Sequence, residues 1–357
     1  MLDDVKALYK ELESCTDNDE RLRIMFDIAT SLLNFDQKRA LEVADEIKAF
    51  ADKIDNNIGR VYYHSTKGRV FFKKTKYHEC ELEFKEALRI SLLTDKLLEQ
   101  AMCHDSLGVL CTYLNRHDEA LSACQAALAV YKQINTRPSF RYQVVCYNNI
   151  GVTYRKMYQS EKALEAFVCA LQLLDEFEVG TMRYTVLNNV AKIKLANGQS
   201  EEAFALANQA MQGFKSSKHK NGMANAGVTI ANYYLNAGNF ATAHTQFLSV
   251  LKLLKAIDNR LAEIAAYIGL GDAYVKMEAF EQAHQHFEKA QALAMSAADD
   301  QELCEVYMAQ AQAYIAQERK DLAQAKYLTA LEHTQERNLP YLRVVFEDLI
   351  RNLDYKS

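Results

Sequence analysis

The sequence repeats itself about every 40 residues, and this period constrains the fold more than any other feature. Five segments align without gaps, and each opens with a small residue, namely Gly68, Gly108, Gly151, Ala231 and Gly271. Twelve positions later stands Ala or Cys. With weaker copies included, this second position runs 40, 80, 120, 163, 203, 243, 283 and 323, so that one step is 43 residues and the others are 40. A fixed period of this length predicts stacked supersecondary units.

The spacing within each repeat is that of paired helices. An aromatic or apolar residue follows the opening position at +3, and small, aromatic and small residues occupy +12, +16 and +19. Steps of three and four residues place side chains on one helix face. We expect small residues to let the two helices of a hairpin approach, and residues such as Phe247 at +16 to fill the groove between neighbouring hairpins. Two prolines and twelve glycines in 357 residues also favour long helices.

This small-x-x-aromatic and small-x-x-x-Phe-x-x-Ala pattern resembles the tetratricopeptide repeat, over nearly the whole chain and closely in five of eight copies. The usual tryptophan is missing, and the period exceeds the common length of about 34 residues. The resemblance implies an all-α superhelix in one solenoid. We expect an N-terminal helix in residues 1–17, eight helical hairpins in 18–340, and a C-terminal capping or linker helix in 341–357.

Motifs that carry catalysis or bind metals are missing from the sequence. It contains no GxSxG, HExxH, GxxxxGK[ST] or GxGxxG pattern. The eight cysteines form no CxxC pair, and several occupy the small or apolar positions of the repeat, as Cys80, Cys111 and Cys124 do. We therefore expect no enzymatic activity, no metal and no cofactor, and reduced thiols in a cytoplasmic protein.

Charge and hydropathy restrict the partners. The formal net charge is -5, which gives no global attraction to nucleic acid. The acidic N-terminus is not a signal peptide, and no apolar run is long enough to span a bilayer. We expect neither nucleic acid nor a membrane as partner.

The resemblance implies that the first helix of each hairpin lines a concave surface that binds partners. Asparagine recurs there in the parallel strings Tyr147–Ile150 and Leu187–Val190, and an amide can pair with a peptide backbone whatever its side chains. Basic residues on the same stretch favour a ligand with acidic residues. The alternative is that these are ordinary solvated side chains. The candidate partner-binding residues for a protein or extended peptide are Arg69, Lys73, Asn148, Asn149, Arg155, Asn188, Asn189, Lys192, Asn232 and Asn236.

Long repeats of this kind resemble the regulatory or sensor arms of bacterial signalling proteins, which precede a diguanylate cyclase, histidine kinase or adenylate cyclase domain. The chain ends at Ser357 after an amphipathic helix, as an arm cut before its output domain would. A free-standing scaffold or adaptor is a close alternative. Another is a quorum-sensing peptide receptor that dephosphorylates response regulators. Such receptors carry an additional N-terminal helical bundle, and repeats that begin near residue 18 are expected to leave too little chain for it.

Overall fold

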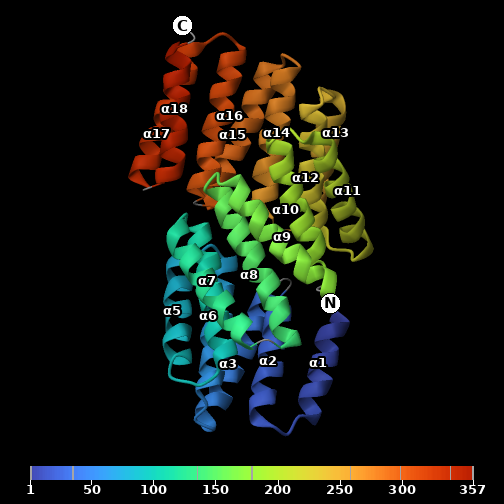
Figure 1. The fold of residues 1–357 in the computed structure, drawn as a ribbon, viewed down its shortest axis with the longest axis vertical. Helices are drawn as coiled ribbons and strands as arrows, with labels where there is room; N and C mark the ends of the chain where they lie inside the picture. The colour runs from blue at the N-terminus through green and yellow to red at the C-terminus, as the bar shows by residue number, and fades with distance from the viewer. Residues whose placement is uncertain are drawn as a thin grey trace. The chain divides into compact units, whose positions relative to one another are not determined.

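The computed structural model describes residues 2–33, 36–134, 136–177, 180–257, 259–297, 299–337 and 339–355. Over these ranges the chain forms α-helices and no strand (Figure 1), which confirms the all-α prediction. Eight helix pairs, α2–α3 to α16–α17, follow α1 and precede α18. The bounds are α1 Leu2–Ser14, α2 Asn18–Leu32, α3 Gln37–Lys53, α4 Asn57–Lys73, α5 Tyr77–Ser91, α6 Leu97–Tyr113, α7 His117–Ile134, α8 Arg137–Lys156, α9 Ser160–Glu176, α10 Met182–Ala196, α11 Ser200–Ser216, α12 Lys220–Asn236, α13 Phe240–Leu254, α14 Arg260–Lys276, α15 Phe280–Ala297, α16 Asp300–Ala316, α17 Lys320–Glu336 and α18 Pro340–Tyr355.

The helices divide into two compact units, Met1–Thr153 (unit 1) and Tyr154–Ser357 (unit 2), and the boundary falls inside α8. Within unit 2, consecutive helices pack against each other, and the first helices of successive hairpins also touch, α10 with α12, α12 with α14, and α14 with α16. Unit 1 shows the same contacts, for example between α4 and α6. Each unit is thus a stack of hairpins, and the continuity of all eight hairpins in one solenoid remains a prediction.

The repeat positions define the core. The small residue that opens a repeat lies against the +16 residue of its own hairpin. A Cβ atom added to Gly271 would lie 2.3 Å from Cε1 of Phe287, and one added to Gly68 would lie 2.4 Å from the ring of Phe84. We expected the +16 aromatic residue between neighbouring hairpins, and Phe247 does lie against Gly269 of the next hairpin. The +16 ring fills its own hairpin as well, because the missing side chain of glycine leaves room for it.

Buried thiols complete this core. All eight cysteines are free, and six are buried, namely Cys80, Cys103, Cys111, Cys124, Cys146 and Cys304. Burial raises the pKa of Cys80 to about 12 and that of Cys103 to about 11, so both remain neutral thiols at physiological pH. No group of three His, Cys, Asp or Glu side chains within the described ranges could hold a metal ion.

The turns inside the hairpins share one backbone geometry. In the second to the eighth hairpin the turn contains a residue with positive φ, and these residues follow the period of the sequence, at Thr75, Asn115, Tyr158, Gly198, Gly238, Glu278 and Glu318. In the last of these turns, the N–H of Glu318 donates to the carbonyl of Ile315 and the N–H of Arg319 donates to that of Tyr314, which closes the helix end. Only two of the seven are glycine. The other five adopt a left-handed backbone conformation that is unfavourable for a residue with a Cβ atom, so the packing of the two helices has to stabilise it.

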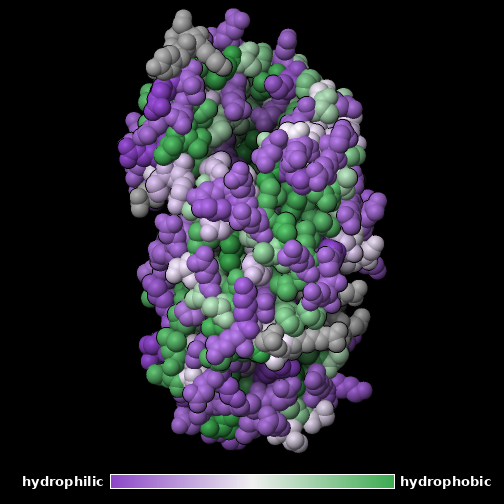
Figure 2. Space-filling model, viewed as in Figure 1, coloured by the Kyte–Doolittle hydropathy of each residue, from purple (hydrophilic) through white to green (hydrophobic). Residues whose placement is uncertain are grey.

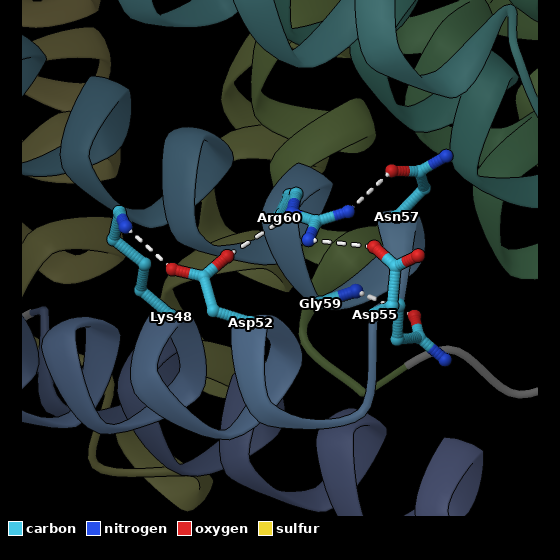
Figure 3. A network of polar contacts seen from close by, with 7 residues as sticks. Lys48, Asp52, Asp55, Asn57, Gly59 and Arg60 are labelled. Carbon is cyan, nitrogen blue, oxygen red and sulfur yellow. Dashed lines mark hydrogen bonds and ion pairs between the residues drawn. The ribbon is translucent and has the colours of Figure 1, made fainter.

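A polar network joins the first hairpin to the second in unit 1 (Figure 3). The Arg60 guanidinium donates to Asp52 at 3.1 Å, to Asp55 at 2.9 Å and to Asn57 at 2.8 Å, and the Lys48 ammonium group donates to Asp52 at 2.6 Å. These contacts connect the end of α3 with the beginning of α4. The carboxylates are exposed, so solvent screens each pair and its contribution to stability is small.

Hydrophilic side chains cover most of the face shown in Figure 2, with small groups of hydrophobic side chains between them. None of the described helices combines the length and the apolar character that crossing a bilayer requires.

Candidate functional site

The ten predicted binding residues fall in both units. Arg69, Lys73, Asn148 and Asn149 belong to unit 1, and the other six belong to unit 2. Lys73 and Asn236 are the last residues of their helices and are exposed. The remaining eight are buried or half-buried on the first helices of their hairpins.

In unit 2, the first helices share an inner face, which we define by the end of α8 together with α10, α12, α14 and α16. Its two ends meet, because the Lys156 ammonium group donates to Oε1 of Gln301 at 3.0 Å across 145 positions of sequence. Both side chains are buried. Charged groups of α8, α10 and α16 therefore lie close to one another on this face.

The cations of the inner face are enclosed. Burial, followed by the nearby charge of Arg155, lowers the pKa of the Lys192 ammonium group to about 8. Among the described residues, nothing accepts a hydrogen bond from the buried Nε of Arg155. The N–H of Arg155 at Nε is therefore available to donate a hydrogen bond to a ligand.

Two carboxylates from α16 face these cations. Burial raises the pKa of Glu302 and that of Glu305, and the charge of Glu305 raises the pKa of Glu302 further. The charges of Arg155 and Lys156 act on both carboxylates in the opposite direction and lower their pKa values. The predicted basic surface is therefore of mixed charge. The ten candidate residues predicted from the sequence include neither Glu302 nor Glu305, which lie three positions apart on α16. The signal was available, because residues three apart on a helix share a face.

One amide oxygen on the inner face, that of Asn188, is buried without a hydrogen-bond partner among the described residues. The Asn188 side chain is 3% exposed. Asn189 and Asn232 are half-buried. A buried acceptor without a donor costs about 1–3 kcal/mol, which a ligand N–H would recover.

Burial also raises the pKa of Asp272 on α14 to about 7.

In unit 1, one predicted residue is engaged by the protein itself. Nδ2 of Asn149 donates to Oδ1 of Asp105 at 3.0 Å, so that amide donor holds a carboxylate in place. Sequence reasoning had assigned it to a ligand backbone. Asn148 is buried, and the Arg69 guanidinium lies 5.3 Å from the centroid of the Phe26 ring.

Comparison with known proteins supports the fold. Residues 222–296 match the family model described as tetratricopeptide repeat. No curated protein has a sequence significantly similar to this chain. Among solved structures, aspartyl phosphate phosphatase F from Bacillus subtilis is similar with a TM-score of 0.66 and 14% identity, over 93% of this chain and 93% of that chain.

Two further similar structures are peptide complexes. NprR with its cognate peptide NprX has a TM-score of 0.62 and 16% identity, over 93% of this chain and 99% of that chain. The Rap conjugation gene regulator of the plasmid pLS20, with the Phr* peptide, has a TM-score of 0.65 and 12% identity, over 92% of this chain and 95% of that chain.

The extent of these matches corrects one expectation. We expected the chain before the repeats to be too short for a receptor of the response-regulator phosphatase type. The fold of phosphatase F is matched over 93% of its length, so this expected shortage does not exclude that class of receptor. The helix order, the packing of successive hairpins and the match of residues 222–296 lead to one conclusion. The chain is an all-α helical repeat protein, and its residues 222–296 match the tetratricopeptide repeat.

Proposed function

We propose that this chain binds an extended peptide, or an extended segment of a partner protein, on the inner face of unit 2, and that it acts by binding and not by catalysis. One observation carries the proposal. Nε of Arg155 and Oδ1 of Asn188 are buried on the same face without hydrogen-bond partners among the described residues, and burial lowers the pKa of the neighbouring Lys192. Enclosed polar groups are costly unless they are paired, and a ligand would pair them.

The chemistry of the face fits a peptide. Amides such as Asn188 and Asn232 can donate to and accept from a backbone whatever its side chains. Lys192 and Arg155 would meet a ligand carboxylate, and a charge-assisted hydrogen bond contributes about 1.5–3 kcal/mol. Glu302 and its neighbour on α16 oppose a purely acidic ligand, so a peptide with charges of both signs is expected. The peptide complexes of NprR and of the Rap regulator add support from the same fold.

The test uses a pool of fluorescein-labelled random peptides, followed by anisotropy titration of the peptides that the chain retains. The double variant Asn188→Ala/Asn232→Ala and the single variant Lys192→Met should each weaken binding at least about tenfold, the equivalent of about 1.4 kcal/mol. The matched control is Gln212→Ala, which removes an exposed amide on α11, the second helix of its hairpin, and should bind as the wild type does. Retention of no peptide, or equal binding by all variants with unchanged circular dichroism, would refute the proposal.

For the cellular role, we propose the regulatory or sensor region of a signalling protein, with a free-standing adaptor as the close variant. The second candidate is a peptide receptor of the response-regulator phosphatase type, which the likeness to aspartyl phosphate phosphatase F favours. Response regulators phosphorylated with acetyl phosphate would separate the two. Faster loss of phosphate in the presence of the chain supports the receptor, and unchanged half-lives across the panel support the regulatory region.

A further inference from the structure

The two ends of the inner face of unit 2 close on each other. The ammonium group of Lys156, the last residue of α8, donates to Oε1 of Gln301 in the first turn of α16 at 3.0 Å. Between these two helices, α9 packs on α10, and the first helices α10, α12, α14 and α16 each touch the next. The helices of unit 2 therefore form a closed ring around the inner face, and the contact between Lys156 and Gln301 closes it.

The contact that closes the ring differs in chemistry from those between successive hairpins. Successive hairpins share buried apolar clusters, such as the one that contains Phe247 of α13 and Leu270 of α14. The ring-closing contact joins a charged group to an amide, with Lys156 8% and Gln301 4% exposed. An ammonium group is strongly hydrated in water, and one amide oxygen replaces only part of that hydration. Because separation returns water to these polar groups but exposes the apolar clusters, the closing contact is the link that opens most readily.

Neighbouring carboxylates act on both states of this contact. Glu302 and Glu305 attract the ammonium group, which favours the closed ring. The same two carboxylates are desolvated in the closed ring, and burial is the largest influence on the pKa of each. Opening returns water to the charges on both sides, which offsets much of the lost attraction.

The two helix ends at the contact are fixed independently of each other. At the start of α16, the Asp299 side chain accepts a hydrogen bond from the N–H of Glu302 at 3.1 Å. At the end of α8, the N–H of Gln159 donates to the carbonyl of Tyr154 at 2.9 Å. Opening therefore separates two formed helix ends and breaks neither of these bonds.

Polar groups of the proposed peptide site are enclosed in the same ring. Nε of Arg155 and Oδ1 of Asn188 are buried and have no hydrogen-bond partner among the described residues. Arg155 directly precedes Lys156, and Asn188 lies on α10. A ligand can pair with buried atoms only after a path to them has opened. The ring-closing contact adjoins Arg155, so its opening would provide such a path.

We propose that the contact between Lys156 and Gln301 is a gate, which opens between α8 and α16 to admit a peptide to the inner face and closes after it. This inference rests on the peptide-binding function proposed above and adds the route by which the ligand enters. The gate opens as a displacement of hairpins, because the helices on both sides keep their ends.

The test acetylates lysines of the full chain with N-hydroxysuccinimide acetate and follows each site by mass spectrometry. Lys156 should react through the open gate, more slowly than the exposed Lys252 of α13. The fully buried thiol of Cys304 on α16 reports unfolding, by its labelling relative to free cysteine. Protection of Lys156 should be at least about tenfold smaller than protection of Cys304, since breaking one charged hydrogen bond costs far less than unfolding a stack of hairpins.

A matched pair of variants isolates the contact. Gln301→Met keeps the size of the side chain but removes the amide acceptor, and it should speed the labelling of Lys156 at least about tenfold. Gln291→Met removes an amide acceptor of the same kind, which Nε2 of Gln310 meets at 3.0 Å between α15 and α16, and it should leave Lys156 unchanged. Peptides that the wild type retains should associate faster with Gln301→Met in stopped-flow anisotropy.

The labelling requires no ligand, so the gate and the peptide site can fail separately. Equal labelling of Lys156 in Gln301→Met and the wild type would refute the gate, and so would equal protection of Lys156 and Cys304. Unchanged peptide association in Gln301→Met, with faster labelling, would show that ligands enter elsewhere. If no peptide is retained although the gate opens, the peptide-binding function fails. If Gln301→Met does not fold, the wild-type comparison of Lys156 with Cys304 decides whether the ring opens.

Discussion

Replacing Gly271 by alanine tests the packing that defines every repeat. Gly271 is the small residue that opens the seventh repeat, inside α14, and it lies against Phe287, which is fully buried. The added Cβ would lie 2.3 Å from Cε1, 2.6 Å from Cζ and 2.7 Å from Cδ1 of that ring, whereas ordinary contacts begin at 3.4 Å. The ring would have to move by about 1 Å within a cluster of buried residues that includes Ala283 and Ala290. In a core of native density there is little space for such a shift.

Two effects of opposite sign set the magnitude. Overpacking a buried site costs about 1–3 kcal/mol. Alanine is the better helix former and recovers about 0.8–1.0 kcal/mol relative to glycine. We therefore expect the free energy of unfolding to fall by up to about 2 kcal/mol. For a unit of this size, each kcal/mol corresponds to about 2–4 °C in Tm.

A double-mutant cycle with Phe287→Leu isolates the clash, measured by thermal and urea unfolding with far-ultraviolet circular dichroism. In the Phe287→Leu background the ring is absent, so Gly271→Ala should stabilise the protein through helix propensity alone. The coupling energy should be about 1–3 kcal/mol. If Gly271→Ala has the same effect in both backgrounds, the glycine does not make room for the ring and the repeat register argued above is wrong.

Three further predictions concern other parts of the fold. Ala163→Leu, at a fully buried small position of α9, should lower the free energy of unfolding by about 1–3 kcal/mol, which urea denaturation would measure. Glu278→Gly should raise it by about 0.5–1 kcal/mol because φ is +58° there, whereas the control Glu288→Gly, in the middle of α15, should lower it by about 1 kcal/mol. Burial raises the pKa of Asp272 from 3.8 to about 7. Between these two pH values the folded state binds a proton that the unfolded state has lost. The free energy of unfolding should therefore fall as the pH rises through that window. Asp272→Asn should abolish that component of the pH profile, and an unchanged profile would show that Asp272 is solvated.

The helices and their register could be predicted because the signal is repeated eight times along the chain. Small residues such as Gly271 and Ala163 mark the places where two helices approach, and any error in one copy is corrected by the others. Turns with glycine, such as that at Gly238, were visible for the same reason.

The charges that face one another were not predictable in this way. Glu302 meets the cations of α8 and α10 because α16 returns toward the end of α8, and this return depends on the small rotation between successive hairpins. An alignment of repeats contains no information on that rotation. The pairing of Asn149 with Asp105 has the same origin, since it joins the first helices of two hairpins at positions that the repeat leaves variable.

The hydrogen bond between Lys156 and Gln301 also has a consequence for synthesis of the protein. Most hairpins pack on their sequence neighbours, so they can fold in order as the chain leaves the ribosome. Gln301 emerges 145 residues after Lys156, so this contact has to wait until most of unit 2 up to α16 has been made. Until then the Lys156 end of the inner face stays without its partner helix, so a nascent chain would lack the complete binding surface that the finished protein offers.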